Sequence, residues 1–239
     1  MITAEVIFRT YQISRTVSTG TAFVIDHCGK QYLVTARHVV NGIADKDSIM
    51  IFHDNEWKTL NVEMVGIGKS HVDVAVFACN ELFVPHLSLE ASANNLGFGQ
   101  QVYFAGFPFG QRWEMNPFAN QSFPTPFVKT GILSGFIENN SLLVVDGYNN
   151  KGFSGGPLVF KPVIQPSNVF QVAGVVSGYQ APLVPIVDKH GHAALDEQGN
   201  PIGYTQENSG LVIAVNIKEV TRLIEANPIG YPLSGHEAS

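Results

Sequence analysis

The chain has 239 residues, of which 45% are hydrophobic and only 14% are charged. This composition excludes an intrinsically disordered chain, and the length is sufficient to bury the core of one all-β domain with two lobes. The formal net charge of −6 disfavours a surface that binds nucleic acid, and no apolar run approaches the length that crosses a membrane.

The N-terminus and the cysteine content indicate the cellular compartment in which the protein is expected. Residues 1–8 lack a basic region followed by an apolar core and a small-residue cleavage site, so they do not read as a signal peptide. The two cysteines, Cys28 and Cys79, can form at most one disulfide, and free thiols fit a reducing compartment better. We therefore expect a cytoplasmic protein.

The chain contains short runs that are apolar or alternate between apolar and polar residues. The first half holds Val6–Tyr11, Thr21–Ile25, Tyr32–Thr35, Ile49–Phe52, Leu60–Val65 and Val74–Ala78. The second half holds Gln101–Ala105, Val128–Ile132, Leu142–Val145, Pro157–Phe160, Phe170–Val176 and Leu211–Val215. Gly, Asn, Asp and Pro separate these runs, a pattern that predicts the strands of a β-barrel or β-sandwich.

A histidine and an aspartate lie at the ends of two of these runs. Tyr32–Thr35 leads into His38, so the histidine follows a strand end, and Asp73 directly precedes the run Val74–Ala78. Taken alone, each is more often structural than catalytic. Together they supply the two groups that activate a serine: a base, and an acid that orients the base.

The segment Lys151–Leu158 carries Ser154 within Gly152-Phe153-Ser154-Gly155-Gly156. A serine hydroxyl is a poor nucleophile unless a base takes its proton and nearby donors stabilise the oxyanion that forms. Glycines let the backbone turn tightly and direct its N–H groups at a ligand. The chain order His38, Asp73, Ser154 is that of the chymotrypsin type of triad.

These three segments resemble the trypsin-like, chymotrypsin-fold serine peptidases, and most closely the bacterial Deg-type domains, here without a PDZ module. Further matching segments are Gly20–Ile25, Gly106–Gly110, Thr130–Gly135 and Val175–Gly178. The resemblance implies one peptidase domain of two six-stranded antiparallel β-barrels with a C-terminal α-helix. Its expected parts are an N-terminal barrel over about 1–106, a connector over 107–127, a second barrel with the closing helix over 128–226, and a tail over 227–239.

The resemblance also implies a serine endopeptidase that acts on polypeptides without a metal or other cofactor. Ser154 would be the nucleophile, His38 the general base and then the general acid, and Asp73 the residue that orients the imidazole. The N–H groups of Gly152 and Ser154 would form the oxyanion hole.

Substrate preference follows from the same resemblance. The primary pocket would be walled by residues 148–151, by residues 176–179 and by the strand near Gly210. Tyr148 stands where relatives that cut after Arg or Lys carry an aspartate, so we expect cleavage after small-to-medium apolar residues. Ser177 would brace Asp73, and Ser177, Gly178 and Tyr179 would bind the substrate peptide.

Phe153 departs from the family pattern, which has Asp or Asn beside the nucleophile. Phe153 cannot pair with a freshly cut N-terminal amine, so we expect no activation of that kind. Either the ring anchors the loop by apolar packing, or the oxyanion loop is mobile at rest and a ligand or partner orders it.

Two long loops and one helix complete the chain. Phe107–Phe127 is an aromatic connector that either gates the site or packs as a linker; it includes Trp113, Phe118 and Phe123. Residues 180–208 predict a hairpin near the active-site rim, in which the pair His190 and His192 reads as a polar turn. The closing helix is expected to begin after Asn216 and to end at Asn227.

Other functions stay open. Gly152–Gly156 also satisfies the G-x-S-x-G pattern of α/β-hydrolases, but that fold needs alternating helices and strands, with the acid and histidine after the serine. A catalytically silent or partner-activated binding module is the main alternative, and an esterase side activity would use the same chemistry. A regulatory partner or an oligomer is compatible with the sequence.

Overall fold

The computed structural model describes residues 2–16, 18–69, 71–84, 88–113, 124–163 and 169–233. Phe118 and Phe123 of the connector lie outside these ranges. The first barrel consists of β1 (Thr10–Arg15), β2 (Ser18–His27), β3 (Lys30–Thr35), β4 (Lys46–His53), β5 (Glu56–Ile67) and β6 (Ala75–Cys79). The second consists of β8 (Gln101–Gly106), β9 (Phe127–Ile137), β10 (Leu142–Asp146), β11 (Pro157–Phe160), β12 (Gln171–Tyr179) and β15 (Leu211–Asn216).

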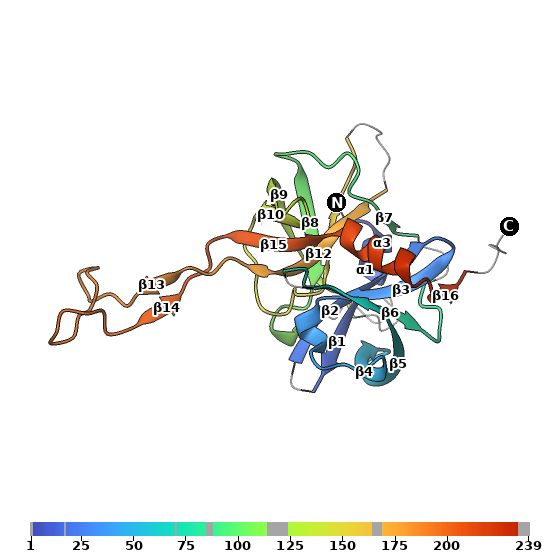
Figure 1. Ribbon diagram of the computed structural model, residues 1–239, viewed down its shortest axis with the longest axis horizontal. Coiled ribbons are helices and arrows are strands. Elements are labelled where there is room, and N and C mark those ends of the chain that lie inside the picture. Colours follow the sequence, from blue (N-terminus) through green and yellow to red (C-terminus); the bar gives the residue numbers. More distant parts are fainter. Residues whose placement is uncertain are drawn as a thin grey trace.

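Strand pairing closes both barrels, as the sequence predicts (Figure 1). In the first barrel the order is β2-β1-β4-β5-β6-β3, and β3 pairs back onto β2. In the second the order is β11-β8-β9-β10-β15-β12, and β12 pairs back onto β11. The short strand β7 (Glu90–Ala91) pairs in parallel with β2 and with β12, so it joins the two barrels.

The core follows from the alternation of apolar residues along the strands. One cluster fills the first barrel and includes Tyr11, Leu33 and Phe77, while another fills the second and includes Phe104. A third cluster brings residues of both barrels together with the C-terminal helix, and Phe23 belongs to it. The two barrels therefore pack together as one unit, and residues at the interface between them contact both barrels.

The N-terminal strand prediction was wrong in its placement. The structure forms helix α1 (Ala4–Phe8) and starts β1 at Thr10, instead of one strand over Val6–Tyr11. The Thr10 hydroxyl donates to the Val6 carbonyl at 2.7 Å, a local bond that stabilises the helical turn. Alternation alone could not distinguish this short turn from a strand, because it spans only five residues.

The closing helix α3 (Ile217–Ala226) begins and ends where the sequence predicts. The side chain of Asn216 accepts a hydrogen bond from the Lys218 N–H at 3.1 Å, which caps the first turn. Ile217 and Ile224 on one face pack into the core between the barrels. Within the described ranges, no helix is long and apolar enough to cross a membrane.

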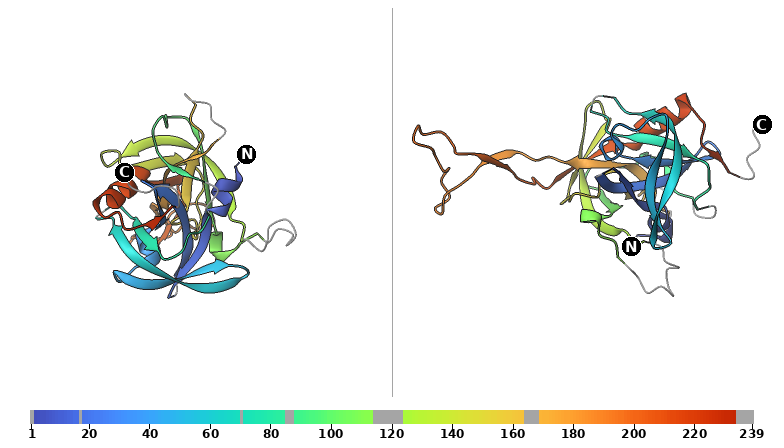
Figure 2. Two further views of the ribbon diagram at one scale, coloured as in Figure 1. Left: turned by 90° about the vertical axis from the view of Figure 1, so that its right-hand side faces the viewer. Right: turned by 90° about the horizontal axis from the view of Figure 1, so that it is seen from below.

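The loop between β12 and β15 forms the predicted hairpin, but it is far longer than a rim loop. Its strands β13 (Leu183–Pro185) and β14 (Tyr204–Gln206) form a separate two-stranded sheet. Figures 1 and 2 show this hairpin projecting away from both barrels as a narrow arm. We call residues 180–210 the arm. On the opposite side of the molecule, β16 (Tyr231–Pro232) pairs with β3.

Candidate active site

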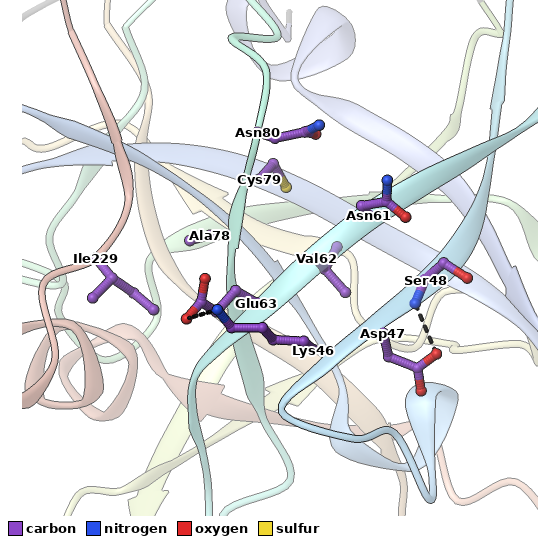
Figure 3. Close-up of a pocket in the computed structure, with 10 residues that line it drawn as sticks. All are labelled: Lys46, Asp47, Ser48, Asn61, Val62, Glu63, Ala78, Cys79, Asn80 and Ile229. Carbon is purple, nitrogen blue, oxygen red and sulfur yellow. Dashed lines mark hydrogen bonds and ion pairs between the residues drawn. The ribbon is translucent and has the colours of Figure 1, made fainter.

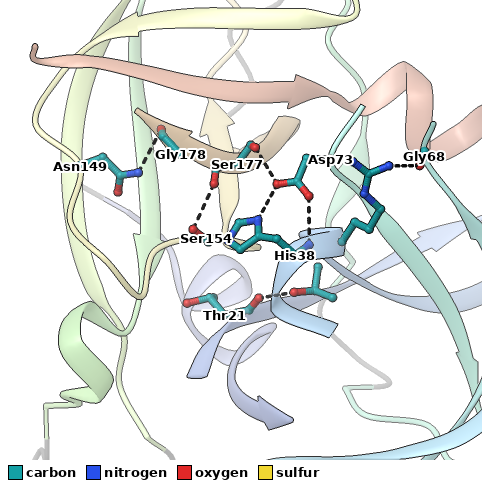
Figure 4. Close-up of polar contacts among 10 residues, drawn as sticks. Thr21, His38, Gly68, Asp73, Asn149, Ser154, Ser177 and Gly178 are labelled. Carbon is teal, nitrogen blue, oxygen red and sulfur yellow. Dashed lines mark hydrogen bonds and ion pairs between the residues drawn. The ribbon is translucent and has the colours of Figure 1, made fainter. Parts of the chain in front are cut away.

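The fold brings His38 and Asp73 together at the ends of paired strands. His38 lies in a short 3-10 helix (Arg37–Val40) after β3, and Asp73 precedes β6. Thr35 and Ala75 are partners in the β3–β6 ladder, so the two residues meet beyond it. One Asp73 oxygen accepts the His38 backbone N–H at 3.0 Å, and the other lies 2.6 Å from His38 Nδ1 (Figure 4).

Asp73 is held as a carboxylate. Burial by itself would raise the pKa of Asp73, but hydrogen bonds from the His38 and Ser177 side chains more than offset it, so the pKa falls below 3.8. The Ser177 hydroxyl donates to Asp73 at 2.7 Å. An ionised Asp73 accepts the Nδ1 proton of His38, which leaves Nε2 of the neutral ring free to act as a base.

Ser177 reaches Asp73 because β12 is irregular at this position. The register between β12 and β15 shifts between Val176 and Gly178, so Ser177 is an extra residue in the ladder. A β-bulge of this kind re-aims a side chain without ending the strand. The bulge directs the Ser177 hydroxyl to Asp73, as the sequence predicts, and its carbonyl oxygen to Ser154.

Ser154 lies on the turn before β11 and is fixed by the first barrel. Its carbonyl accepts the Thr21 N–H at 2.9 Å, and its hydroxyl donates to the Ser177 carbonyl at 3.1 Å. Among the described hydrogen bonds, none joins the Ser154 hydroxyl to His38. Contacts through Ser177 and Asp73 link Ser154 to the histidine, and Figure 4 shows all four side chains in one cluster.

The backbone around Ser154 presents unused donors. The Lys151 carbonyl accepts the Phe109 N–H at 2.8 Å, and the Gly152 carbonyl accepts the Thr21 hydroxyl at 2.7 Å. In contrast, the N–H groups of Gly152 and Ser154 have no acceptor within the described part of the chain. Both residues are partly exposed. Paired free donors beside a serine are what a developing oxyanion requires.

Gly152 is needed for this arrangement. Its φ is +102°, in the region that side chains disfavour, and a Cβ at this position would lie 2.2 Å from the Phe107 carbonyl oxygen. Any other residue would have to move the turn away from the connector. Because the Lys151–Gly152 peptide is planar and trans, such a move would also re-aim the Gly152 N–H.

The comparisons with known proteins agree with this fold. A family model described as a trypsin-like peptidase domain matches residues 20–161, which is more than half of the chain. The chain belongs to this family. No curated relative matches it.

Solved protease structures share the fold. A serine endoprotease from Yersinia pestis aligns over 95% of this chain and 67% of its own, with 18% identity and a TM-score of 0.57. An inactive form of Rv3671c from M. tuberculosis aligns over 95% and 89%, with 18% identity and a TM-score of 0.54. The HtrA-type protease AlgW, solved with a tripeptide, aligns over 94% and 63%, with 19% identity and a TM-score of 0.55.

Phe153, the departure from the family pattern, is fully buried. Its ring packs edge-on against Phe104 of β8, with centroids 5.3 Å apart, inside the core of the second barrel. This packing corresponds to the anchoring alternative that the sequence left open. The residue next to Ser154 is therefore held by apolar packing.

Lys129 of β9 contacts the loop of residues 148–154, which contains Phe153 and Ser154. Its ammonium donates to the Tyr148 carbonyl at 2.7 Å and to the Asn150 side chain. It also lies 5.4 Å from the centre of the Phe153 ring, and burial lowers the pKa of Lys129. Sequence reasoning missed this residue, since nothing marks it within an ordinary alternating strand.

The predicted pocket residues lie on two facing segments that a buried side chain connects. Asn149 donates from its amide to the Gly178 carbonyl at 3.1 Å and accepts from Asn208 at its own carbonyl. Tyr148 exposes 58% of its surface, and Tyr179 continues the strand from Gly178. Sequence reasoning placed Asn149 within the wall formed by residues 148–151, but it did not predict that this side chain connects the two segments, because nothing in the sequence distinguishes it from the neighbouring Asn150.

A separate pocket of about 510 Å³ lies on the outer face of the first barrel (Figure 3). It is lined by residues of β4, β5 and β6 and by Ile229. Cys79 in its wall is a free thiol, and burial, with a smaller effect of Glu81, raises its pKa to about 12. That thiol is protonated at neutral pH and is a poor nucleophile, and the pocket shares no residue with the candidate site.

Proposed function

We propose that this protein is a serine endopeptidase in which Ser154 attacks the peptide carbonyl. His38 takes the serine proton and returns it to the leaving amine, while Asp73 holds the imidazole in the required tautomer. The N–H groups of Gly152 and Ser154 bind the oxyanion of the tetrahedral intermediate. The observation that supports this most is the pair of unused N–H groups beside Ser154, with the 2.6 Å contact between His38 and Asp73.

The Ser154 hydroxyl has to leave Ser177 before it can react. We propose that a bound substrate donates its own backbone N–H to the Ser177 carbonyl and displaces the Ser154 hydroxyl, which then turns to His38. Catalytic hydrogen bonds that form only in the substrate complex are common in this chemistry. The present hydrogen bond, 3.1 Å long, is also the observation that favours the alternative of a partner-activated protein.

For specificity, we propose cleavage after small-to-medium apolar residues. The segments expected to wall the pocket, residues 148–151 and 176–179, contain no acidic residue. The ammonium of Lys129 instead lies under Tyr148 and Asn150. A substrate Arg or Lys would meet a like charge and no carboxylate, which disfavours its binding.

A reducing, cytoplasmic location is part of the proposal. Cys28 is an exposed free thiol and Cys79 is a free thiol as well. Exposed free thiols are uncommon in oxidising compartments.

Hydrolysis of an unfolded polypeptide by the wild type and by Ser154→Ala tests the proposed activity. We expect the variant to be at least about 10⁴-fold slower, because the nucleophile is lost. Fluorogenic peptides that end in Ala, Val, Leu, Arg or Lys before the cleaved bond test the preference, and the apolar set should be cut faster. Equal rates for Ser154→Ala and wild type would refute the activity; preferred cleavage after Arg would refute the specificity alone.

A further inference from the structure

The arm is a direct continuation of the strands that border the candidate site. Backbone hydrogen bonds pair Gln180 with Leu211 and Ser209, and then pair Pro182 with Glu207. The ladder of β13 and β14 follows immediately. One two-stranded ribbon therefore runs from the site to the end of the arm, as Figure 2 shows from below.

Local hydrogen bonds order the end of the arm. The Asp188 carboxylate accepts the backbone N–H groups of His190 and His192 at 2.8 and 3.0 Å. In a second turn, the Asp196 carboxylate accepts the N–H groups of Gln198 and Asn200, both at 2.9 Å. The tip thus consists of two side-chain-capped turns.

The arm is a free-standing ribbon that exposes several large apolar side chains. Six large apolar side chains are 42–67% exposed: Leu183, Ile186, Val187, Leu195, Ile202 and Tyr204. A lone two-stranded hairpin is only marginally stable in water, and exposed apolar clusters mark surfaces that bind a partner. The arm therefore has the properties of a binding surface.

The open edge of the ribbon faces the candidate nucleophile. β12 pairs with β11 only over Gln171–Val175, so Gly178 and Tyr179 are paired on the β15 side alone and Ser177, at the bulge, has no partner in either ladder. The other edge is the side on which the Ser154 hydroxyl contacts Ser177. An extended chain added antiparallel to this edge runs toward Ser154, with its upstream residues along the arm.

We propose that the arm binds the substrate itself, as an extended apolar segment upstream of the cleaved bond that adds a strand to β13. The proposal rests on the proposed peptidase function. Tyr179 and Leu183 are four residues apart, a separation of about 13 Å in an extended chain. The arm therefore contacts substrate residues that lie several positions upstream of the cleaved bond.

Charge disfavours a second copy of the arm as the occupant. The arm has four acidic residues, Asp188, Asp196, Glu197 and Glu207, against the single cation Lys189. Two arms side by side would bring like charges together. An apolar polypeptide that is neutral or basic meets no such repulsion.

The test uses two internally quenched peptides with the same four residues before the cleaved bond. One continues upstream with Val, Ile and Leu, and the other continues with Gly and Ser. The arm variant replaces Leu183–Gln206 by an Asn-Gly turn, which can close the ribbon after Pro182. A milder variant combines Leu183→Ser with Val187→Ser, and the pair Ile132→Ser and Ile137→Ser on β9, two exposed positions outside the arm, is its matched control. Circular dichroism and Tm show that each variant is folded.

We expect the wild type to cleave the apolar peptide with a kcat/KM about tenfold above that of the Gly-Ser peptide. Both arm variants should lose this preference and still cleave the Gly-Ser peptide as the wild type does, while the β9 control variant should keep the preference. A preference that survives removal of the arm would overturn the proposal. A dimer in light scattering that the arm variant dissociates would overturn it in favour of a second copy.

A binding measurement tests the role of the arm independently of catalysis. In a Ser154→Ala background, fluorescence anisotropy of the apolar peptide should show Kd rising about tenfold when the arm is removed. This readout needs no turnover, so it remains informative if the protein is not a peptidase. An unchanged Kd contradicts the arm proposal, and absent turnover by the wild type contradicts the proposed function.

Discussion

At the scale of single residues, Asp73 organises the site because its two oxygens accept from the His38 backbone, the His38 ring and the Ser177 hydroxyl. These bonds favour the ionised form. Because the folded-state pKa of Asp73 lies below its ordinary value of 3.8, this carboxylate stabilises the fold at neutral pH. That contribution is lost as the pH falls through the lowered pKa. The loss of activity on mild acidification should therefore come from a group other than Asp73.

An Asp73→Asn variant should lose about 10⁴-fold in kcat, as an amide at this position favours the wrong imidazole tautomer. Ser177→Ala should cause a smaller loss, since the contacts between Asp73 and His38 remain. Peptide hydrolysis between pH 4 and 9 measures both. An Asp73→Asn enzyme with near wild-type kcat would show that Asp73 does not orient His38.

Phe153 is the residue at which the loop is tied to the barrel core. Phe153→Ala should destabilise the protein by roughly 3–5 kcal/mol and also lower kcat, because the cavity would loosen the turn that aims the two N–H groups. Phe160→Ala is the matched control, since Phe160 is equally buried in the same cluster. Denaturation and kcat measured on both variants would contradict the anchoring role if Phe153→Ala kept full stability and activity.

At the scale of elements, loop 148–154 is stabilised from two barrels at once. Thr21 of β2 holds it from the first barrel, through its N–H and its hydroxyl. Lys129 of β9, in the second barrel, holds it through hydrogen bonds to the Tyr148 carbonyl and the Asn150 side chain. The turn that carries the N–H groups of Gly152 and Ser154 is thus held by strands that are far from Ser154 in the chain.

Lys129→Met should lower kcat/KM several-fold with little change in Tm, because the variant keeps the apolar stem but loses the hydrogen bonds to the loop. Lys129→Arg should restore part of the activity. Lys161→Met is the control, since Lys161 makes a comparable contact with a ring, that of Phe170, away from the site. Equal effects of the two Met variants on kcat/KM would argue against a specific support.

At the scale of the whole molecule, alternating apolar runs locate the barrel strands except β1, which begins at Thr10, and the flanking motifs single out His38, Asp73 and Ser154 as candidates. These features are local in the sequence, so local patterns predict them. The bond from Thr21 to Gly152 joins residues 131 positions apart, and it exists only because the barrels pack face to face. The sequence predicted the hairpin but not how far it projects from the barrels. Its ribbon continues by backbone pairing through a segment rich in Gly and Pro, which side-chain patterns do not reveal.

The central claim is that Ser154 is an activated nucleophile. Intact-mass spectrometry after incubation with a fluorophosphonate, followed by peptide mapping, measures this directly for the wild type and for Ser154→Ala. The account predicts a single adduct on Ser154 and none on the variant, whose fold circular dichroism should show to be unchanged. A folded wild type that stays unlabelled, or labelling that persists in Ser154→Ala, would contradict the account.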